Sequence, residues 1–239
     1  MPSAGARARA GPSLRSLLGL LALVCLGSGC ATTAELRGRL SLPAAAGSAS
    51  ETADGNPGSS ASRAAPVTDA VIYVVPDRSR GTPAPTGKSA SGSRNRPQSE
   101  RRTVVLTTNG FEPRVLPVTA GSTVRFLNRD RVYHSPFSVS PACRFSLKGC
   151  APGQERSVVF DTVGVVNLYC ELHPAAAGFV FVRPDRLFAC PRADGHFTLP
   201  RLAPGAYIVK VWHPVLGETS RRVKVTGGRP VELDLAWSR

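Results

Sequence analysis

The chain has 239 residues, a formal net charge of +14 at pH 7 and a hydrophobic fraction of 42%. This length is enough for one or two domains, and the basic balance favours anionic partners such as acidic proteins or lipid head groups. Because the N-terminal segment has the composition of an export signal, we expect no nucleic-acid partner.

The N-terminal segment predicts export. Arg7, Arg9 and Arg15 lie in a stretch without acidic residues, and the apolar run Leu17–Leu26 is followed by the small residues of "GSGC". This order is that of a secretory signal peptide, which we assign to residues 1–29. The alternative is a buried N-terminal helix. The apolar run is too short to span a bilayer.

The end of this segment, "LGSGC", also resembles a bacterial lipobox, although Leu26 lies one position further from Cys30 than lipoboxes place their large aliphatic residue. We expect Cys30 to be lipidated, which would hold the protein on a membrane without a transmembrane helix. Simple secretion is the alternative. The expected location is the periplasm or the outer membrane of a bacterium.

The rest of the chain contains short apolar or alternating runs that are interrupted by glycine and proline. Examples are "DAVIYVV", "RTVVLTT", "STVRFLN", "RSVVFD", "VVNLYC", "GFVFV", "AYIVKVW" and "VELDLAW". Alternation with a period of two residues indicates strands with one buried face. The sequence therefore predicts an all-β protein with sandwich or barrel architecture.

Two segments do not have the composition of a packed domain. Residues 43–66 are rich in alanine, serine and glycine, and residues 78–102 are basic and rich in serine, glycine and proline. Such compositions are typical of disordered inserts and linkers. These segments separate a block at residues 103–183 from the flanking sequence.

The two flanks contain related signals. "AELRGRLSL" and "PVTDAVIYVV" precede the block, while "DGHFTLP" and "LAPGAY" follow it and place tight turns between alternating strands. Together they resemble a transthyretin-like sandwich of the carboxypeptidase regulatory type, with its first strands in residues 34–77 and the remainder in residues 184–239. The resemblance implies that the middle block is inserted into a split sandwich. Two domains in series are the alternative.

The middle block contains "FEPRVLPVTAGSTVRFLNRD" before His134, and then "VFDTVGVVNLYCELHP" with Cys170 and His173. In this order the motifs resemble the cupredoxin family, of the plastocyanin-like or methylamine-utilisation-protein-like kind. The resemblance implies a Greek-key β-sandwich with one type 1 copper ion, bound by His134, Cys170 and His173. Two imidazoles and a thiolate suit a copper ion that alternates between Cu(I) and Cu(II).

Other chemistries fit these residues less well. A structural zinc site needs four ligands, and no second cysteine or third histidine lies nearby in the sequence. Haem attachment needs Cys-x-x-Cys-His, which is absent. The spacing allows a Cys–His hydrolase, but no recognisable third group accompanies the pair.

The ligand loop departs from the family at two positions. Related loops read Cys-x-x-His-Pro-x-Met with an axial methionine, whereas this chain has Ala176 there and Met1 as its single methionine. The site is expected to be three-coordinate, or to take a fourth contact from water, another side chain or the carbonyl of Tyr133, and to have a raised reduction potential. Ser135 replaces an asparagine that cross-links the ligand loops in related proteins.

Four cysteines remain after Cys25 in the signal and Cys30 at the predicted anchor, namely Cys143, Cys150, Cys170 and Cys190. An oxidising compartment permits disulfides. We favour a Cys143–Cys150 disulfide that closes the loop "RFSLKG", which would leave Cys190 unpaired.

The expected function is that of an electron carrier rather than an enzyme. An exported blue-copper protein would move single electrons between redox partners at the cell envelope, and its positive charge suits an acidic c-type cytochrome. The first alternative is a periplasmic protein that binds copper for storage or delivery. The second is a structural envelope module whose copper site has decayed.

Overall fold

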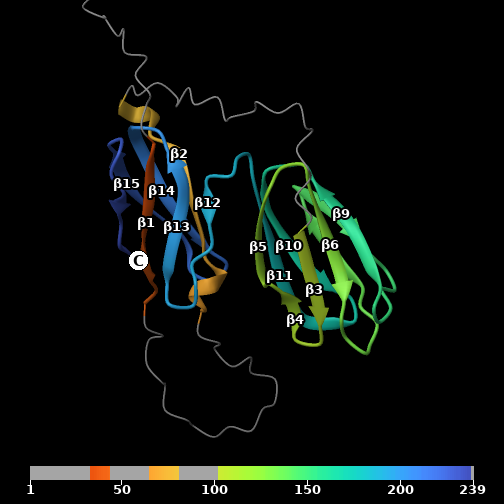
Figure 1. The fold of residues 1–239 in the computed structure, drawn as a ribbon. Coiled ribbons are helices and arrows are strands. Elements are labelled where there is room, and N and C mark those ends of the chain that lie inside the picture. The colour runs from red at the N-terminus through yellow and green to blue at the C-terminus, as the bar shows by residue number, and fades with distance from the viewer. Residues whose placement is uncertain (1–32, 44–64, 81–101, 238–239) are drawn as a thin grey trace, which may run out of the picture. The chain divides into compact units, whose positions relative to one another are not determined.

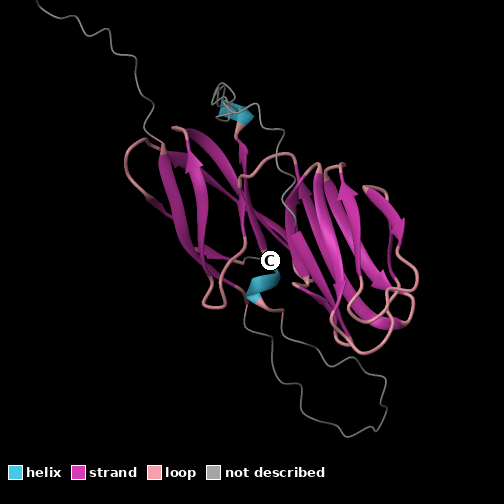
Figure 2. Ribbon diagram, turned by 45° about the vertical axis from the view of Figure 1, so that its right-hand side comes forward, coloured by secondary structure: helices cyan, strands magenta, loops and turns pink. Residues whose placement is uncertain are grey.

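The computed structural model describes residues 33–43, 65–80 and 102–237. Over these ranges the chain consists of β-strands and connecting loops, with two single-turn 3-10 helices, η1 (Val67–Asp69) and η2 (Arg78–Arg80), as Figure 2 shows. The predicted all-β class is therefore confirmed. No helix within the described ranges is long and apolar enough to cross a membrane. The predicted signal, residues 1–29, and the lipidation site Cys30 lie outside the described residues.

One sheet of the sandwich outside the middle block is organised around β1 (Ala34–Ser41). This strand pairs antiparallel with β13 (His196–Leu202) and parallel with β16 (Val231–Glu232) and β17 (Leu235–Ala236). A strand that precedes the middle block therefore shares a sheet with strands that follow it (Figure 1).

The second sheet of this sandwich has the strand order β12–β2–β14–β15. Its strands are β12 (Phe188–Ala189), β2 (Val71–Pro76), β14 (Gly205–His213) and β15 (Gly217–Val225). Both sheets thus combine strands from the two sides of the middle block, which is the pairing that an inserted block requires. The likeness of this sandwich to transthyretin stays a prediction.

The core of this sandwich follows from the alternation along its strands. Leu36 from β1 and Tyr207, Val209 and Val211 from β14 belong to one apolar cluster and are at most 2% exposed. The buried Tyr207 hydroxyl donates a hydrogen bond to the carbonyl of Ala203 at 2.9 Å. The phenol therefore does not lose the partner that it would have in water.

The predicted bounds of the linker, residues 78–102, are wrong at both ends, because ordered structure extends past each of them. The Asp77 carboxylate accepts hydrogen bonds from the backbone N and the hydroxyl of Ser79 at 3.1 and 2.6 Å, which stabilises η2. Arg102 already belongs to a strand and pairs with Val124. Residues 81–101 lie outside the described residues.

The insert predicted at residues 43–66 also ends earlier than expected. The Pro66 carbonyl accepts hydrogen bonds from Asp69 N at 2.9 Å and from His213 Nε2 at 3.2 Å. Hydrogen bonds therefore connect Pro66 to the sandwich. Residues 44–64 lie outside the described residues.

Residues 102–183, all of them described, form two further sheets (Figure 1). One has the order β4–β3–β6–β9, with β4 (Gly110–Glu112), β3 (Arg102–Thr107), β6 (Ser122–Asn128) and β9 (Glu155–Phe160). The other has the order β5–β11–β10–β7–β8, with β5 (Val115–Thr119), β11 (His173–Arg183), β10 (Gly164–Cys170), β7 (Pro136–Ser140) and β8 (Cys143–Ser146). Each sheet contains one parallel pair, β3 with β6 and β5 with β11.

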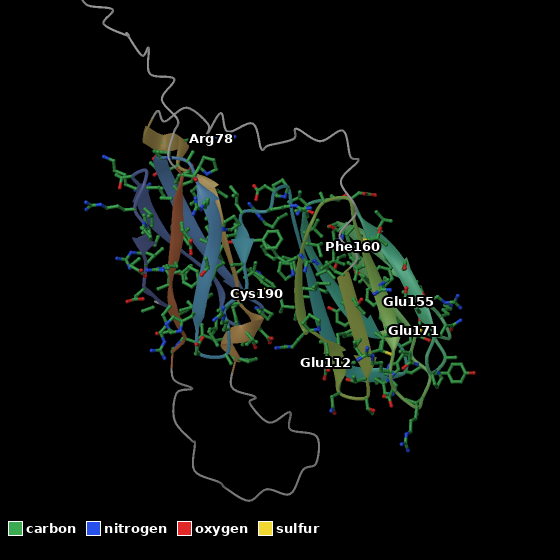
Figure 3. The ribbon with its side chains drawn as sticks, in the orientation of Figure 1. Arg78, Glu112, Glu155, Phe160, Glu171 and Cys190 are labelled. Atoms are coloured by element: carbon green, nitrogen blue, oxygen red, sulfur yellow. The ribbon has the colours of Figure 1, made fainter. Side chains whose placement is uncertain are left out.

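The core of the middle block lies between these two sheets. Phe126 and Phe160 from the first sheet pack in one cluster with Val166 and Leu168 from the second, and each is at most 1% exposed. Phe160, labelled in Figure 3, is the last residue of β9. Because side chains alternate along a strand, the residue after Leu168 on the buried face of β10 is Cys170. The buried face of β10 in the middle block therefore ends with the Cys170 thiol.

Candidate metal centre

His134 lies in the loop between β6 and β7, and hydrogen bonds fix the backbone of this loop. His134 N donates to Cys150 O at 3.0 Å, and Cys150 N donates to His134 O at 2.8 Å. The side-chain amide of Asn128, at the end of β6, donates to the carbonyls of Val132 and Cys150 at 2.8 and 2.9 Å. The imidazole, which belongs to a residue only 2% exposed, therefore has a defined position although it is on a loop.

The tight turn between β10 and β11 positions Cys170 and His173. These two residues face each other in the strand register, so only Glu171 and Leu172 form the loop. Glu171, labelled in Figure 3, is exposed and marks this end of the block. Cys170 is 5% exposed, whereas His173 is half-buried. The Cys-x-x-His spacing thus brings a buried thiol next to an imidazole that reaches the surface.

The two imidazoles face the sulfur of Cys170. Its Sγ lies 3.7 Å from Nδ1 of His134 and 3.5 Å from Nδ1 of His173, and the two ring centroids are 4.4 Å apart. Thiolate and imidazole bind zinc at about 2.3 and 2.0 Å, so a shared three-coordinate ion would separate sulfur from nitrogen by roughly 3.5 to 3.8 Å. The observed distances fit one metal ion.

The three predicted ligand residues therefore come together. In the described part of the chain, they are the one cluster of three or more His, Cys, Asp or Glu side chains whose ligand atoms lie within 4.8 Å of one another. The donor set of two nitrogens and one sulfur suits copper. His134, Cys170 and His173 would hold the ion.

Ser135 connects the elements that position these groups. Its backbone N donates to Cys170 Sγ at 3.4 Å, and its carbonyl accepts a hydrogen bond from Glu171 N at 3.1 Å. Its hydroxyl accepts a hydrogen bond from Gly149 N at 3.2 Å. Ser135 thus cross-links the His134 loop to the Cys170 turn mainly through its backbone, which explains how the site can lack an asparagine here.

Asp130 also belongs to the site, although it was not among the predicted site residues. Its carboxylate Oδ2 lies 3.2 Å from Nε2 of His134. The hydrogen bond from the Thr108 hydroxyl, followed by that from Arg131 N, lowers the pKa of Asp130 to about 2. An ionised carboxylate can only accept a hydrogen bond, so it favours the tautomer of His134 that has its proton on Nε2. Nδ1 then keeps a free electron pair for a metal. An acidic residue four positions before the histidine, in "NRDRVYH", was the available signal.

Ala176 is the residue at which the resemblance to cupredoxin loops predicts that an axial methionine is missing. Its side chain is 3% exposed and belongs to the same apolar cluster as Cys170. Gly110, with φ of +125°, packs beside it, because a Cβ on Gly110 would lie 3.7 Å from the Ala176 Cα. The surroundings of Ala176 are therefore apolar and closely packed. A contact from the Tyr133 carbonyl stays a prediction.

The disulfide predicted between Cys143 and Cys150 is wrong, because both thiols are free. Cys143 Sγ contacts the carbonyl of Val159 at 3.8 Å, whereas Cys150 Sγ contacts the carbonyl of Gln154 at 3.5 Å. The two sulfurs therefore face different elements. Burial raises the pKa of both thiols, which keeps them protonated. Cys190 is also free.

Comparisons with known proteins give results only at the level of solved structures. No protein-family model matches the chain, and no curated protein sequence matches it. A purple cupredoxin from Nitrosopumilus maritimus is similar over 34% of this chain and 99% of its own, with 24% identity and a TM-score of 0.32.

Two further solved structures match about a third of the chain. A copper-containing nitrite reductase from Thermus scotoductus SA-01 is 26% identical over 35% of this chain and 22% of its own, with a TM-score of 0.33. A methionine-to-alanine variant of amicyanin in the Cu(I) state is 29% identical over 35% of this chain and 82% of its own, with a TM-score of 0.32. The solved structures that are similar to about a third of this chain thus include cupredoxins.

Proposed function

We propose that this protein is a one-electron carrier with a type 1 copper ion bound by His134, Cys170 and His173. The observation that carries the proposal is that Nδ1 atoms of two histidines lie 3.7 and 3.5 Å from one cysteine sulfur. A site with two imidazoles and one thiolate is the ligand set of electron-transfer copper proteins.

A copper ion held by these three residues would supply one-electron chemistry between Cu(II) and Cu(I). The role of the chain is to keep the ligand geometry similar in both states. The paired hydrogen bonds between His134 and Cys150 restrain the first of these ligands, and the bond from Ser135 N to Sγ restrains Cys170. The hydrogen bond to sulfur also stabilises the negative charge of a thiolate.

The route for electrons is through the half-buried ligand. His173 is partly exposed, and its neighbours include Leu172, which is 53% exposed, while Tyr133 beside His134 is 57% exposed. Exposed apolar side chains next to a ligand offer a surface for a transient partner. The net charge, +14 for the whole chain and +11 without the signal-like residues 1–29, favours an acidic partner, for which an acidic c-type cytochrome is our candidate.

The cellular setting of the proposal rests on the sequence. The signal-like segment at residues 1–29 and the lipobox-like Cys30 support export and a lipid anchor on a bacterial envelope membrane. We propose electron transfer between redox partners at that membrane, without turnover of a substrate.

The first test is addition of one equivalent of Cu(II) to the purified chain, followed by visible and EPR spectroscopy. We expect an intense thiolate-to-copper charge-transfer band that is lost in Cys170→Ala. Cys150→Ala is the matched control, because it removes another buried thiol of the same core whose sulfur faces Gln154 instead of the histidines. A folded wild-type protein without the band would exclude a blue-copper carrier.

A second function, copper storage or delivery, is favoured by one observation. The apolar Ala176 gives no axial donor, and a three-coordinate thiolate site suits Cu(I). The two functions differ in kinetics. Fast electron self-exchange between the Cu(I) and Cu(II) forms, measured by NMR line broadening, would support the carrier. Tight Cu(I) binding with slow exchange and rapid transfer of the ion to a chelator would support delivery.

A further inference from the structure

The turn between β3 and β4 contacts the group that supports His134. The Thr108 hydroxyl donates to Asp130 Oδ2 at 2.5 Å, and the same oxygen lies 3.2 Å from His134 Nε2. The other carboxylate oxygen, Oδ1, accepts a hydrogen bond from Arg131 N at 2.7 Å. Both oxygens of Asp130 are therefore held, and Thr108 holds the one that faces the histidine.

The contact follows from the register of a parallel strand pair. Leu106 on β3 pairs with Asn128 on β6, so the two chains leave the sheet side by side. Thr108 and Asp130 each lie two residues beyond this pair. The Asn128 side-chain oxygen accepts a hydrogen bond from Asp130 N at 2.9 Å, and Arg129 N donates to Leu106 O at 3.3 Å. The backbone thus places both side chains at the same edge.

Without the Thr108 hydroxyl, Asp130 would have other orientations available. The Asp130 side chain is 15% exposed and lies between Arg129 and Arg131, which are exposed. A carboxylate that loses a donor can rotate toward water or toward a neighbouring cation. In such an orientation, Nε2 of His134 would lose its acceptor.

We propose that Thr108 is a positioning residue of the metal centre. Its hydroxyl fixes the Asp130 carboxylate, Asp130 accepts the hydrogen bond from His134 Nε2, and Nδ1 remains directed at the sulfur of Cys170. The proposal rests on the metal site proposed above, but it also concerns the metal-free protein. Groups that orient a ligating histidine typically change metal affinity by about 10- to 100-fold. We expect a loss in this range for Asp130→Asn, and a smaller loss of a few-fold for Thr108→Val.

The test begins with the metal-free full-length chain, labelled with ¹⁵N in its histidines. The ring nitrogen shifts of His134 report which nitrogen carries the proton and whether it is hydrogen-bonded. Two matched controls come from the same turn. Thr107→Val removes a hydroxyl that donates to Gly110 O at 3.3 Å instead of to Asp130, and Thr108→Ser keeps the hydroxyl at position 108.

We expect Thr108→Val and Asp130→Asn to shift the His134 ring signals in the same direction, while both controls leave them in place. The double variant should resemble Asp130→Asn alone, because Thr108 acts through Asp130. Copper affinity, measured by competition with a chelator, should fall in the same order.

Unchanged His134 signals in a folded Thr108→Val variant would overturn the proposal. So would equal effects of Thr107→Val and Thr108→Val. If the wild-type chain binds no copper, the proposed function fails, but the metal-free spectra still decide whether Thr108 positions His134.

Discussion

Two buried histidines, one in each sandwich, have opposite surroundings. His213, at the end of β14, is 0% exposed and uses both ring nitrogens for hydrogen bonds with the backbone. Nε2 donates to Pro66 O at 3.2 Å, and Nδ1 accepts hydrogen bonds from the backbone N of Val215 and Leu216 at 3.2 and 3.3 Å. This imidazole has no capacity left for a ligand.

His134 is almost as deeply buried, at 2% exposed, but only one ring nitrogen is engaged by a hydrogen-bond acceptor. Nε2 faces the Asp130 carboxylate, while Nδ1 faces Cys170 Sγ at 3.7 Å with His173 on the same sulfur. Burial alone therefore does not distinguish a ligand from a structural histidine. The distinction lies in what the second nitrogen faces.

The largest expected effect is a difference in copper binding between a variant of His134 and the same variant of His213. We expect His134→Asn to remove the thiolate-to-copper band and to lower copper affinity by more than about 100-fold, since even groups behind a ligand change affinity by 10- to 100-fold. His213→Asn should leave the band and the affinity unchanged. Visible spectroscopy and chelator competition on both variants would measure this. Equal loss of copper in the two variants would contradict the assignment of His134 as a ligand and of His213 as a structural residue.

For the free energy of unfolding we expect the opposite order, with the larger loss in the His213 variant. His213→Asn should lower the free energy of unfolding by about 1–3 kcal/mol, because buried backbone groups at Pro66, Val215 and Leu216 lose their partner. His134→Asn in the metal-free protein should cost less, since its ring nitrogens hold no backbone group. Denaturant titration of both metal-free variants gives the two values. A larger loss for His134→Asn would contradict the assignment of roles.

The pH dependence of stability should also reveal the structural role of His213. Burial lowers the pKa of His213, opposed in part by the hydrogen bond to the Pro66 carbonyl and by the Asp69 carboxylate. As the pH falls through the unfolded-state pKa near 6.5, the unfolded chain gains a proton that the folded chain does not. Stability should therefore decrease by up to about 1.4 kcal/mol per pH unit until the folded pKa is reached.

This pH-dependent loss should be smaller in His213→Asn. Denaturant titrations of the wild type and of this variant at pH 7.5 and at pH 5 isolate the contribution of His213, because other titrating groups contribute to both. Parallel slopes in the two proteins would show that His213 is not the group responsible.

The smallest effect concerns the apolar side of the metal site. Ala176→Met should offer copper a fourth, axial donor and lower the reduction potential, because an added ligand stabilises the more highly charged Cu(II) more than it stabilises Cu(I), which three ligands already suit. Each tenfold change in the relative affinity for the two oxidation states corresponds to about 59 mV. Ala175→Met is the control, since Ala175 is exposed on the same strand. Potentiometric titration giving an equal or higher potential for Ala176→Met would contradict the expectation.

Much of the site could be predicted from local sequence. Alternation along β10 places Val166, Leu168 and Cys170 on the buried face, and a tight turn then returns His173 to face Cys170. These relations depend only on the strand period and on a short loop. The order of motifs was enough to add His134 by resemblance to a family.

Other features required the tertiary structure. The Thr108–Asp130 contact exists because β3 and β6 are parallel neighbours, and the cysteines at 143 and 150 stay apart because their sulfurs face different elements. His213 has a structural role because the carbonyl of Pro66, 147 residues away in the chain, accepts a hydrogen bond from its ring.

The sequence by itself determined which side of each strand is buried and the spacing of Cys170 and His173. The tertiary structure decided which strands are neighbours, and with that the groups that support His134. The physical reason is that side-chain periodicity encodes burial within one strand, whereas strand pairing is chosen by the packing of residues far apart in the chain.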